Sequence, residues 1–300
     1  MRSASEPLAG QNALLVGDFE VTALGDGLLD VPLASYQSAD HSVDVEGQEH
    51  RILASHDIAI DEAANFLIPN CAFLVRGQGR NVLVDTGAGG KIPPFAGNGF
   101  VIESLHKVGL APSDIDDVLM THLHPDHVGG LVTDTGHRRF PNARLHISGA
   151  EWEYWHDDSQ RAQAPDFVQA VFDGARSATA PYEARLQLFS SQRQALLPGI
   201  SAIPLPGHTP GHTGYLVESA HGDKVLIWGD IVHSEFLEFP HPDWSMTFDV
   251  DPAQAVMTRQ GTMSWAAEEQ FLVAGMHLAS TAMGRVAVSG DAFELIPRAR

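Results

Sequence analysis

The sequence predicts a single layered α/β domain. Three observations lead to this prediction: β-rich runs occur in both halves of the chain, helical patterns lie between and after them, and 44% of the 300 residues are hydrophobic. A chain of this length and composition can bury a sizeable core. Strands in both halves, with helices available for the outer faces, fit one layered domain better than two separate folds.

The first part of the chain contains four strand-like runs. Residues 18–24 alternate like a half-buried strand, and a Gly-Asp-Gly turn leads into a second run at 28–31. Two further β-rich runs, at 71–75 and 81–85, are separated by Gly77-Gln78-Gly79, which predicts a hairpin.

A long, poorly periodic segment, residues 32–69, separates these pairs of runs. A connection of that length is usually functional or binds a partner. We therefore expect an arm or loop that covers a site or contacts a second subunit. Residues 1–15 are expected to form an N-terminal tail, and residues 16–300 the domain itself.

Helical patterns and further strands occupy the rest of the chain. Residues 100–108 have helical spacing that stops at Gly109, and residues 118–120 form a short apolar run suited to a buried strand. The other expected elements are helices at 151–156, 165–178 and 252–269 and strands at 200–205, 214–218, 224–228, 271–274 and 285–288. Asp251 is placed to cap the helix that follows it.

The composition narrows the function. The chain has 38 acidic against 18 basic side chains, a formal net charge of -20, which argues against nucleic-acid or anionic-membrane partners. No apolar run approaches the roughly 18 residues of a membrane-spanning helix. With one cysteine, Cys71, and 16 histidines, metal chemistry would use imidazole and carboxylate ligands. A free cysteine and an N-terminus without an apolar signal segment favour the cytoplasm.

The stretch most informative about chemistry is Thr-His-Leu-His-Pro-Asp-His at residues 121–127. His122 and His124 alternate at the end of a strand, so both imidazoles lie on one face. The proline that follows breaks the strand and allows Asp126 and His127 to turn back. Four ligand-type side chains so close together indicate two adjacent metal sites rather than a surface histidine cluster on a turn.

This motif resembles that of the metallo-β-lactamase superfamily of hydrolases, and the resemblance covers residues 16–297. Further motifs of the family follow in order: Asp-Thr-Gly at 85–87, Pro-Gly-His-Thr-Pro-Gly-His-Thr at 206–213, Trp-Gly-Asp at 228–230 and Ala-Gly-Met-His at 274–277. The resemblance implies a four-layer αββα sandwich formed by one domain.

The resemblance also implies the ligands of two divalent metal ions. They are His122, His124 and His208 for one ion, and Asp126, His127 and His277 for the other, with Asp230 bridging both. Asp85 is implied as a support that does not touch the metal. Zinc is the expected metal, with iron, manganese and cobalt as alternatives, because imidazole–carboxylate sites accept all four.

His233 lies three residues after Asp230 and is a further candidate. Acyl-homoserine lactonases that resemble this chain place a tyrosine there, which polarises the carbonyl or protonates the leaving alkoxide, whereas enzymes of the methyl parathion hydrolase type have an aliphatic residue. A histidine can donate a proton, so it favours lactone or ester chemistry. The alternative is a histidine that merely lines the pocket. His212, four residues after His208, is expected to be structural.

Aromatic residues supply the expected substrate pocket. The pocket candidates are Phe95, Trp155, Phe172 and His241, with Trp152 and Phe167 in the same segments. A plain core role is the alternative for aromatic residues at helical spacing. An apolar wall beside two metal ions would suit a hydrophobic acyl chain or an aryl leaving group.

The expected function is dinuclear metal-dependent hydrolysis of neutral hydrophobic esters, foremost lactones of the acyl-homoserine type. In the expected mechanism a metal-bridging hydroxide attacks the carbonyl carbon, Asp126 orients the hydroxide, and His233 assists the leaving oxygen. The alternatives are an organophosphate triesterase or arylesterase of the methyl parathion hydrolase type and, more distantly, a mononuclear iron persulfide dioxygenase. The expected partners are a small-molecule substrate and a second copy in a homodimer.

Overall fold

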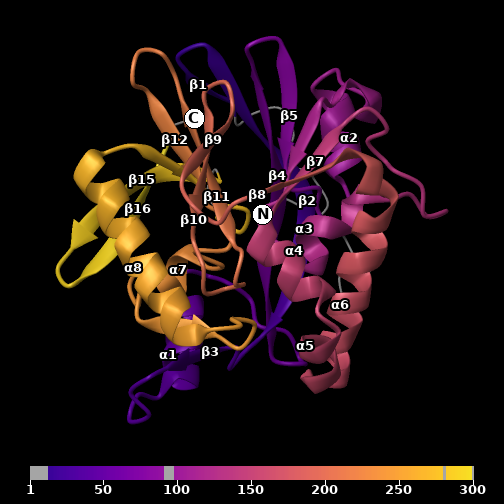
Figure 1. Cartoon of the computed structure of the whole chain (residues 1–300). Helices are drawn as coiled ribbons and strands as arrows, with labels where there is room; N and C mark the ends of the chain where they lie inside the picture. Colours follow the sequence, from indigo (N-terminus) through magenta and orange to yellow (C-terminus); the bar gives the residue numbers. More distant parts are fainter. Residues whose placement is uncertain (1–12, 91–97, 280–281, 299–300) are drawn as a thin grey trace.

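The computed structural model describes residues 13–90, 98–279 and 282–298. Two seven-stranded sheets pack face to face, and helices cover their outer faces. Figure 1 shows α8 outside one sheet and α2, α4 and α6 outside the other. The four-layer αββα sandwich expected from the resemblance is therefore confirmed.

The first sheet has the order β1-β2-β4-β5-β6-β7-β8. Its strands are β1 Ala13–Val16, β2 Phe19–Pro32, β4 Asn65–Gly77, β5 Arg80–Val84, β6 Asp117–Leu119, β7 Arg144–Ser148 and β8 Leu186–Phe189. Residues 13–15, expected in the tail, thus belong to β1. Strands β5 to β8 pair in parallel, so their carboxyl ends lie at one edge of the sheet.

The second sheet has the order β16-β15-β14-β12-β11-β10-β9. Its strands are β9 Gln194–Leu197, β10 Ile200–Pro204, β11 Thr213–Glu218, β12 Lys224–Ile227, β14 Leu272–Ala274, β15 Met283–Ser289 and β16 Ala292–Pro297. Strands β12 and β14 pair in parallel, so the loops that follow them begin side by side.

Helices flank both sheets. They are α2 Val101–Lys107, α3 Pro125–Val128, α4 Gly149–His156, α5 Asp158–Gln163, α6 Asp166–Thr179, α7 Glu235–Glu238 and α8 Pro252–Glu269, with short 3-10 helices at Pro112–Asp114, Gly129–Leu131 and Ala180–Arg185. Asp251 caps α8 as predicted, because its side chain accepts a hydrogen bond from the Gln254 backbone N–H at 3.0 Å. None of the helices in the described ranges is long and apolar enough to cross a membrane.

The Gly-Asp-Gly turn predicted at residues 25–27 is wrong. Strand β2 continues through it with a bulge between Gly25 and Gly27. The cause is Asp26, which is fully buried and accepts hydrogen bonds from the backbone N–H groups of Ala88 at 2.8 Å and Val101 at 3.2 Å. The carboxylate thus points into the protein and fixes the loop after β5, so the chain does not reverse.

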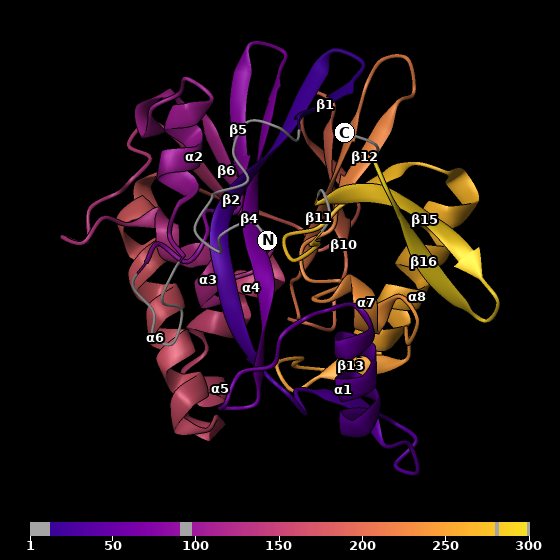
Figure 2. The same cartoon turned by 180° about the vertical axis from the view of Figure 1, so that it is seen from behind.

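Residues 33–64, which we call the arm, are more ordered than the sequence predicts. They contain β3 Tyr36–Ser38 and helix α1 Val45–Ser55, and β3 pairs with β13 Trp244–Met246. Buried side chains of the arm, such as Leu53, form a small separate core with residues of α7 and β13. Figure 1 places α1 at the same end of the molecule as α7 and β3, and Figure 2 places it there with α7 and β13. The arm therefore packs on its own chain, and its contact with a second subunit stays a prediction.

A buried carboxyl group holds the arm together. Glu49 of α1 is fully buried, and its Oε2 accepts a hydrogen bond from the Ala34 backbone N–H at 2.9 Å. Burial raises the pKa of Glu49 to about 7, although the N–H groups of Ala34 and Tyr36 oppose the shift. Since the unfolded chain releases this proton near the ordinary glutamate pKa, the free energy of unfolding falls as pH rises from there to about 7.

We expect Glu49→Gln to remove this pH dependence. The amide keeps one acceptor oxygen and cannot ionise. The free energy of unfolding of the natural chain should fall by about 2 kcal/mol between pH 5 and pH 8, and that of the variant should not show this fall. Urea unfolding of both proteins at the two pH values measures the difference. Glu62→Gln, at an exposed position of the arm, is the control. An unchanged pH dependence in Glu49→Gln would show that Glu49 titrates normally.

Candidate metal centre

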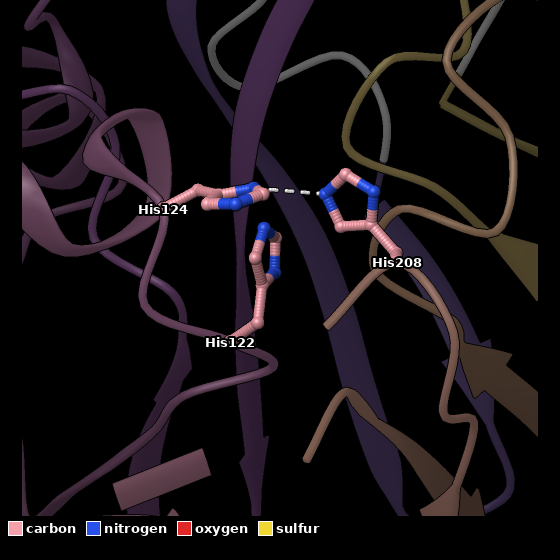
Figure 3. Close-up of side chains that lie close together, drawn as sticks. All are labelled: His122, His124 and His208. Atoms are coloured by element: carbon pink, nitrogen blue, oxygen red, sulfur yellow. Dashed lines mark hydrogen bonds between the residues drawn. The ribbon is translucent and has the colours of Figure 1, made fainter. Parts of the chain in front are cut away.

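The seven expected ligands come together at one edge of the sandwich. His122 and His124 follow β6, and α3 supplies Asp126 and His127 in its first turn. The others follow strand ends of the second sheet: His208 after β10, Asp230 after β12 and His277 after β14. Figure 3 shows the imidazoles of His122, His124 and His208 pointing toward one another. The parallel pairing of β12 with β14 brings Asp230 and His277 together, and β10 runs in the same direction as β12 because β11 between them is antiparallel to both.

The ligand atoms form two groups. In each group, the atoms lie within 4.8 Å of one another: His122, His124 and His208 in one, and Asp126, His127, Asp230 and His277 in the other. Asp230 lies between them. Its Oδ2 is 3.6 Å from His122 Nε2, 3.4 Å from His208 Nε2, 3.2 Å from His127 Nε2 and 3.3 Å from His277 Nε2. This is the position that a bridging carboxylate requires.

The donor set fits divalent metal ions. His122 Nε2, His127 Nε2 and Asp230 Oδ1 are buried without a hydrogen-bond partner among the described residues. An unsatisfied buried polar atom costs about 1–3 kcal/mol, which coordination would offset. Burial also lowers the pKa of His122 and of His124 well below the ordinary histidine value. Both imidazoles are therefore neutral, as metal ligands must be.

Outer partners orient the imidazoles. His127 Nδ1 lies 2.7 Å from Asp85 Oδ2, and His208 Nδ1 lies 2.8 Å from Asp249 Oδ1. His277 Nδ1 donates to a backbone carbonyl oxygen at 2.9 Å. Such contacts fix the ring tautomer and would leave Nε2 available to bind a metal ion. Asp85 has the supporting position that the resemblance implies. The sequence analysis missed Asp249, which no local motif connects with His208.

His212 supports the site without facing it. Its Nδ1 donates to the Leu205 carbonyl oxygen at 2.9 Å, and its Nε2 accepts from the Asp230 backbone N–H at 3.0 Å. Burial lowers its pKa to about 3, so the ring is neutral. Both nitrogens are thereby occupied, and His212 fixes the start of the loop that carries Asp230.

His233 lies beside the metal ligands. Its side chain is 4% exposed, and its Nε2 is 3.4 Å from Asp230 Oδ2. On the other side of the ring, Nδ1 lies 3.4 Å from Glu238 Oε1. Burial opposes protonation of His233, but the Glu238 and Asp230 carboxylates outweigh it and raise its pKa to about 10. Bound dications would counteract the contribution of Asp230, which leaves Glu238 as the carboxylate that favours the charged ring.

The expected pocket residues Trp155, Phe172 and His241 lie in different surroundings. Trp155 and Phe172 are 1% and 0% exposed and pack with ring centroids 4.6 Å apart between α4 and α6, which favours the core interpretation. Trp155 also packs edge-on against His124 at 5.5 Å. His241 stacks on Trp244 at 4.2 Å, outside both ligand groups.

The other described aromatic candidates, Trp152 and Phe167, do not form a wall of a substrate pocket. Phe95 lies outside the described residues. Trp152 stacks on His156 at 3.6 Å, and Phe167 is 68% exposed.

The segment around Asp249, which the sequence analysis also missed, contacts His208 through its backbone as well. Phe248 and Val250 are 44% and 39% exposed and flank Asp249, the partner of His208. The Val250 backbone N–H donates to the His208 carbonyl oxygen at 3.0 Å. This tertiary hydrogen bond, which no local pattern signals, holds the backbone of the segment after β13 against His208.

Comparison with known proteins agrees with this geometry. A curated N-acyl homoserine lactonase from Bacillus cereus is 25% identical over 188 residues, 56% of this chain. The alignment covers 66% of the lactonase, so the chain spans about two thirds of the length of such curated relatives.

Two solved structures match nearly the whole chain. The hydrolase AbOPH of the beta lactamase superfamily is 31% identical with a TM-score of 0.86, covering 97% of this chain and 98% of its own. AidC, described as a dizinc quorum-quenching lactonase in complex with the product N-hexanoyl-L-homoserine, is 26% identical with a TM-score of 0.87, covering 98% and 99%.

The family model of the metallo-beta-lactamase superfamily matches residues 65–262, about two thirds of the chain. The matched range contains six of the seven expected ligands, and the two-sheet sandwich agrees with the match. The chain belongs to the metallo-beta-lactamase superfamily of metal-dependent hydrolases.

Proposed function

We propose that the chain is a dinuclear metal-dependent hydrolase of neutral hydrophobic esters, foremost lactones of the acyl-homoserine type. The observation that carries the proposal is the position of Asp230 between two complete ligand groups. The names of the Bacillus lactonase and of AidC support the substrate class.

The proposed reaction needs a hydroxide nucleophile, a group that orients it and a proton donor for the leaving oxygen. Two bound dications would supply hydroxide near neutral pH and polarise the carbonyl under attack. Asp126 is partly exposed at the edge of the cluster, with its Oδ2 3.2 Å from His127 Nε2 and 3.6 Å from His277 Nε2, so its carboxylate can accept a hydrogen bond from the attacking group and orient it. His233 then donates a proton from Nε2 to the leaving oxygen, while Glu238 holds Nδ1.

His233 favours lactones over phosphotriesters for a chemical reason. Opening a lactone leaves a strongly basic alkoxide, which needs a proton in the transition state. An aryl phosphotriester leaves a phenolate, which departs without protonation. A buried histidine supported by Glu238 therefore benefits the first reaction more than the second.

A paired kinetic assay on the metal-replete enzyme tests the function. One arm follows acid release from a hydrophobic acyl-homoserine lactone, and the other follows phenolate release from a dimethyl aryl phosphotriester. We expect a kcat/KM near or above ~10⁴ M⁻¹s⁻¹ on the lactone alone. The reverse preference would assign a phosphotriesterase. One iron per chain with oxygen consumption on a persulfide would assign a dioxygenase instead.

His233→Leu tests the proton donor. We expect kcat/KM on the lactone to fall by roughly 100-fold, a typical contribution of general acid catalysis, and the phosphotriester rate to change much less. His106→Leu, at an exposed position of α2, is the control and should leave both rates unchanged. Equal losses on both substrates, or no loss on the lactone, would rule out this role.

Asp230→Ala tests the bridging position. Removal of the carboxylate takes a ligand atom from both groups, so we expect bound metal and hydrolysis of every substrate to be lost together. Metal content by elemental analysis and folding by circular dichroism are the measurements. A folded variant that keeps two tightly bound ions would contradict the bridging role.

A further inference from the structure

A single buried carboxylate connects the loops that carry one ligand group. Glu151 of α4 is 1% exposed. Four donors meet its two oxygens: Oε1 accepts from the Leu123 N–H at 2.9 Å and Trp155 Nε1 at 2.6 Å, and Oε2 accepts from Thr209 Oγ1 at 2.6 Å and the Gly211 N–H at 3.0 Å. Burial raises the pKa of Glu151, and the four donors, two on each oxygen, oppose this shift by stabilising the carboxylate.

Every donor belongs to a segment next to a ligand. Leu123 lies between His122 and His124, and the Trp155 ring packs against His124. Thr209 directly follows His208, and Gly211 belongs to the same loop. Glu151 therefore links the loop after β6 of the first sheet to the loop after β10 of the second sheet.

The second loop could not approach so closely with another residue in place of Gly211. A Cβ atom there would lie 2.1 Å from the Glu151 backbone nitrogen. The other ligand group is supported differently, because His127 contacts Asp85 and His277 contacts the Pro69 carbonyl oxygen. The carboxylate of Glu151 thus contacts the two loops that carry His122, His124 and His208 directly, and it reaches the other group only through the chain that continues from these loops.

We propose that Glu151 is a positioning residue for the His122–His124–His208 group. Its carboxylate fixes His122 and His124 relative to His208 before a metal ion binds, and so sets the affinity of this group more strongly than that of the other. The inference rests on the proposed dinuclear site, but it concerns metal binding and not the substrate. Loss of such an outer partner typically weakens a metal site about 10- to 100-fold.

Glu151→Gln is the main test. The amide has the same shape but offers N–H groups where two of the donors need an acceptor, so both loops lose part of their support. We expect one zinc ion per chain to bind about 10- to 100-fold more weakly in competition with a chromophoric chelator, while the second keeps its affinity. Cobalt substitution should show the same asymmetry as the loss of one of two absorption components.

Further variants make the result decisive. Glu151→Asp keeps the carboxylate and should restore part of the affinity, whereas Glu153→Gln, exposed on the same helix, should bind two ions like the natural chain. If Glu151→Gln does not fold, Thr209→Val removes one donor and should shift the same ion by a smaller factor.

Two outcomes would overturn the inference. In one, Glu151→Gln binds both ions with unchanged affinity. In the other, both ions weaken equally, which would show a general role in folding. The substrate assay distinguishes this failure from that of the proposed function, because a chain without lactonase activity can still show the asymmetric loss of one ion.

Discussion

The rest of the structure depends on a group of buried candidate metal ligands, three of whose polar atoms lack a hydrogen-bond partner in the described ranges. His122 Nε2, His127 Nε2 and Asp230 Oδ1 have no hydrogen-bond partner within the described ranges, and buried polar atoms are rarely left in that state. The fold therefore prepares a place for positive charge. It does so through topology, since β5 with β6 and β12 with β14 are parallel pairs whose carboxyl ends deliver the ligand loops to one edge.

The ligands could be predicted from the sequence because their pattern is local. His122 and His124 alternate on a strand end, and Asp126 and His127 follow a proline that begins α3. The geometry of a few consecutive residues sets these positions, so they can be predicted without the tertiary structure. The order of the later motifs predicted His208, Asp230 and His277 as the remaining ligands, and the same resemblance predicted the sandwich.

The supporting residues could not be predicted because their relations are tertiary. Asp249 meets His208 across 41 residues of sequence, and Glu151 meets Thr209 across 58. Likewise, helical spacing predicts that Trp155 and Phe172 share a face with other apolar residues but does not tell whether that face meets a substrate or the core. The bulge at Asp26 was missed because its carboxylate is satisfied by backbone groups of residues far along the chain.

The arm is connected to the site through buried charge. Glu238, which holds His233, also contacts Arg259 Nη2 at 2.8 Å and the Tyr36 hydroxyl of the arm at 3.2 Å. Arg259 is 1% exposed and also donates to the Ile231 and Trp244 carbonyl oxygens. Burying an ion pair costs a desolvation free energy about as large as the electrostatic attraction between its charges. The Glu238–Arg259 pair is therefore weak evidence for a higher free energy of unfolding. The pair instead fixes geometry, because it holds β13, the arm and the loop before His233 in one arrangement. The Met246 N–H of β13 also donates to Asp249 at 2.8 Å, and Asp249 contacts His208, so displacement of the arm would disturb both His233 and His208.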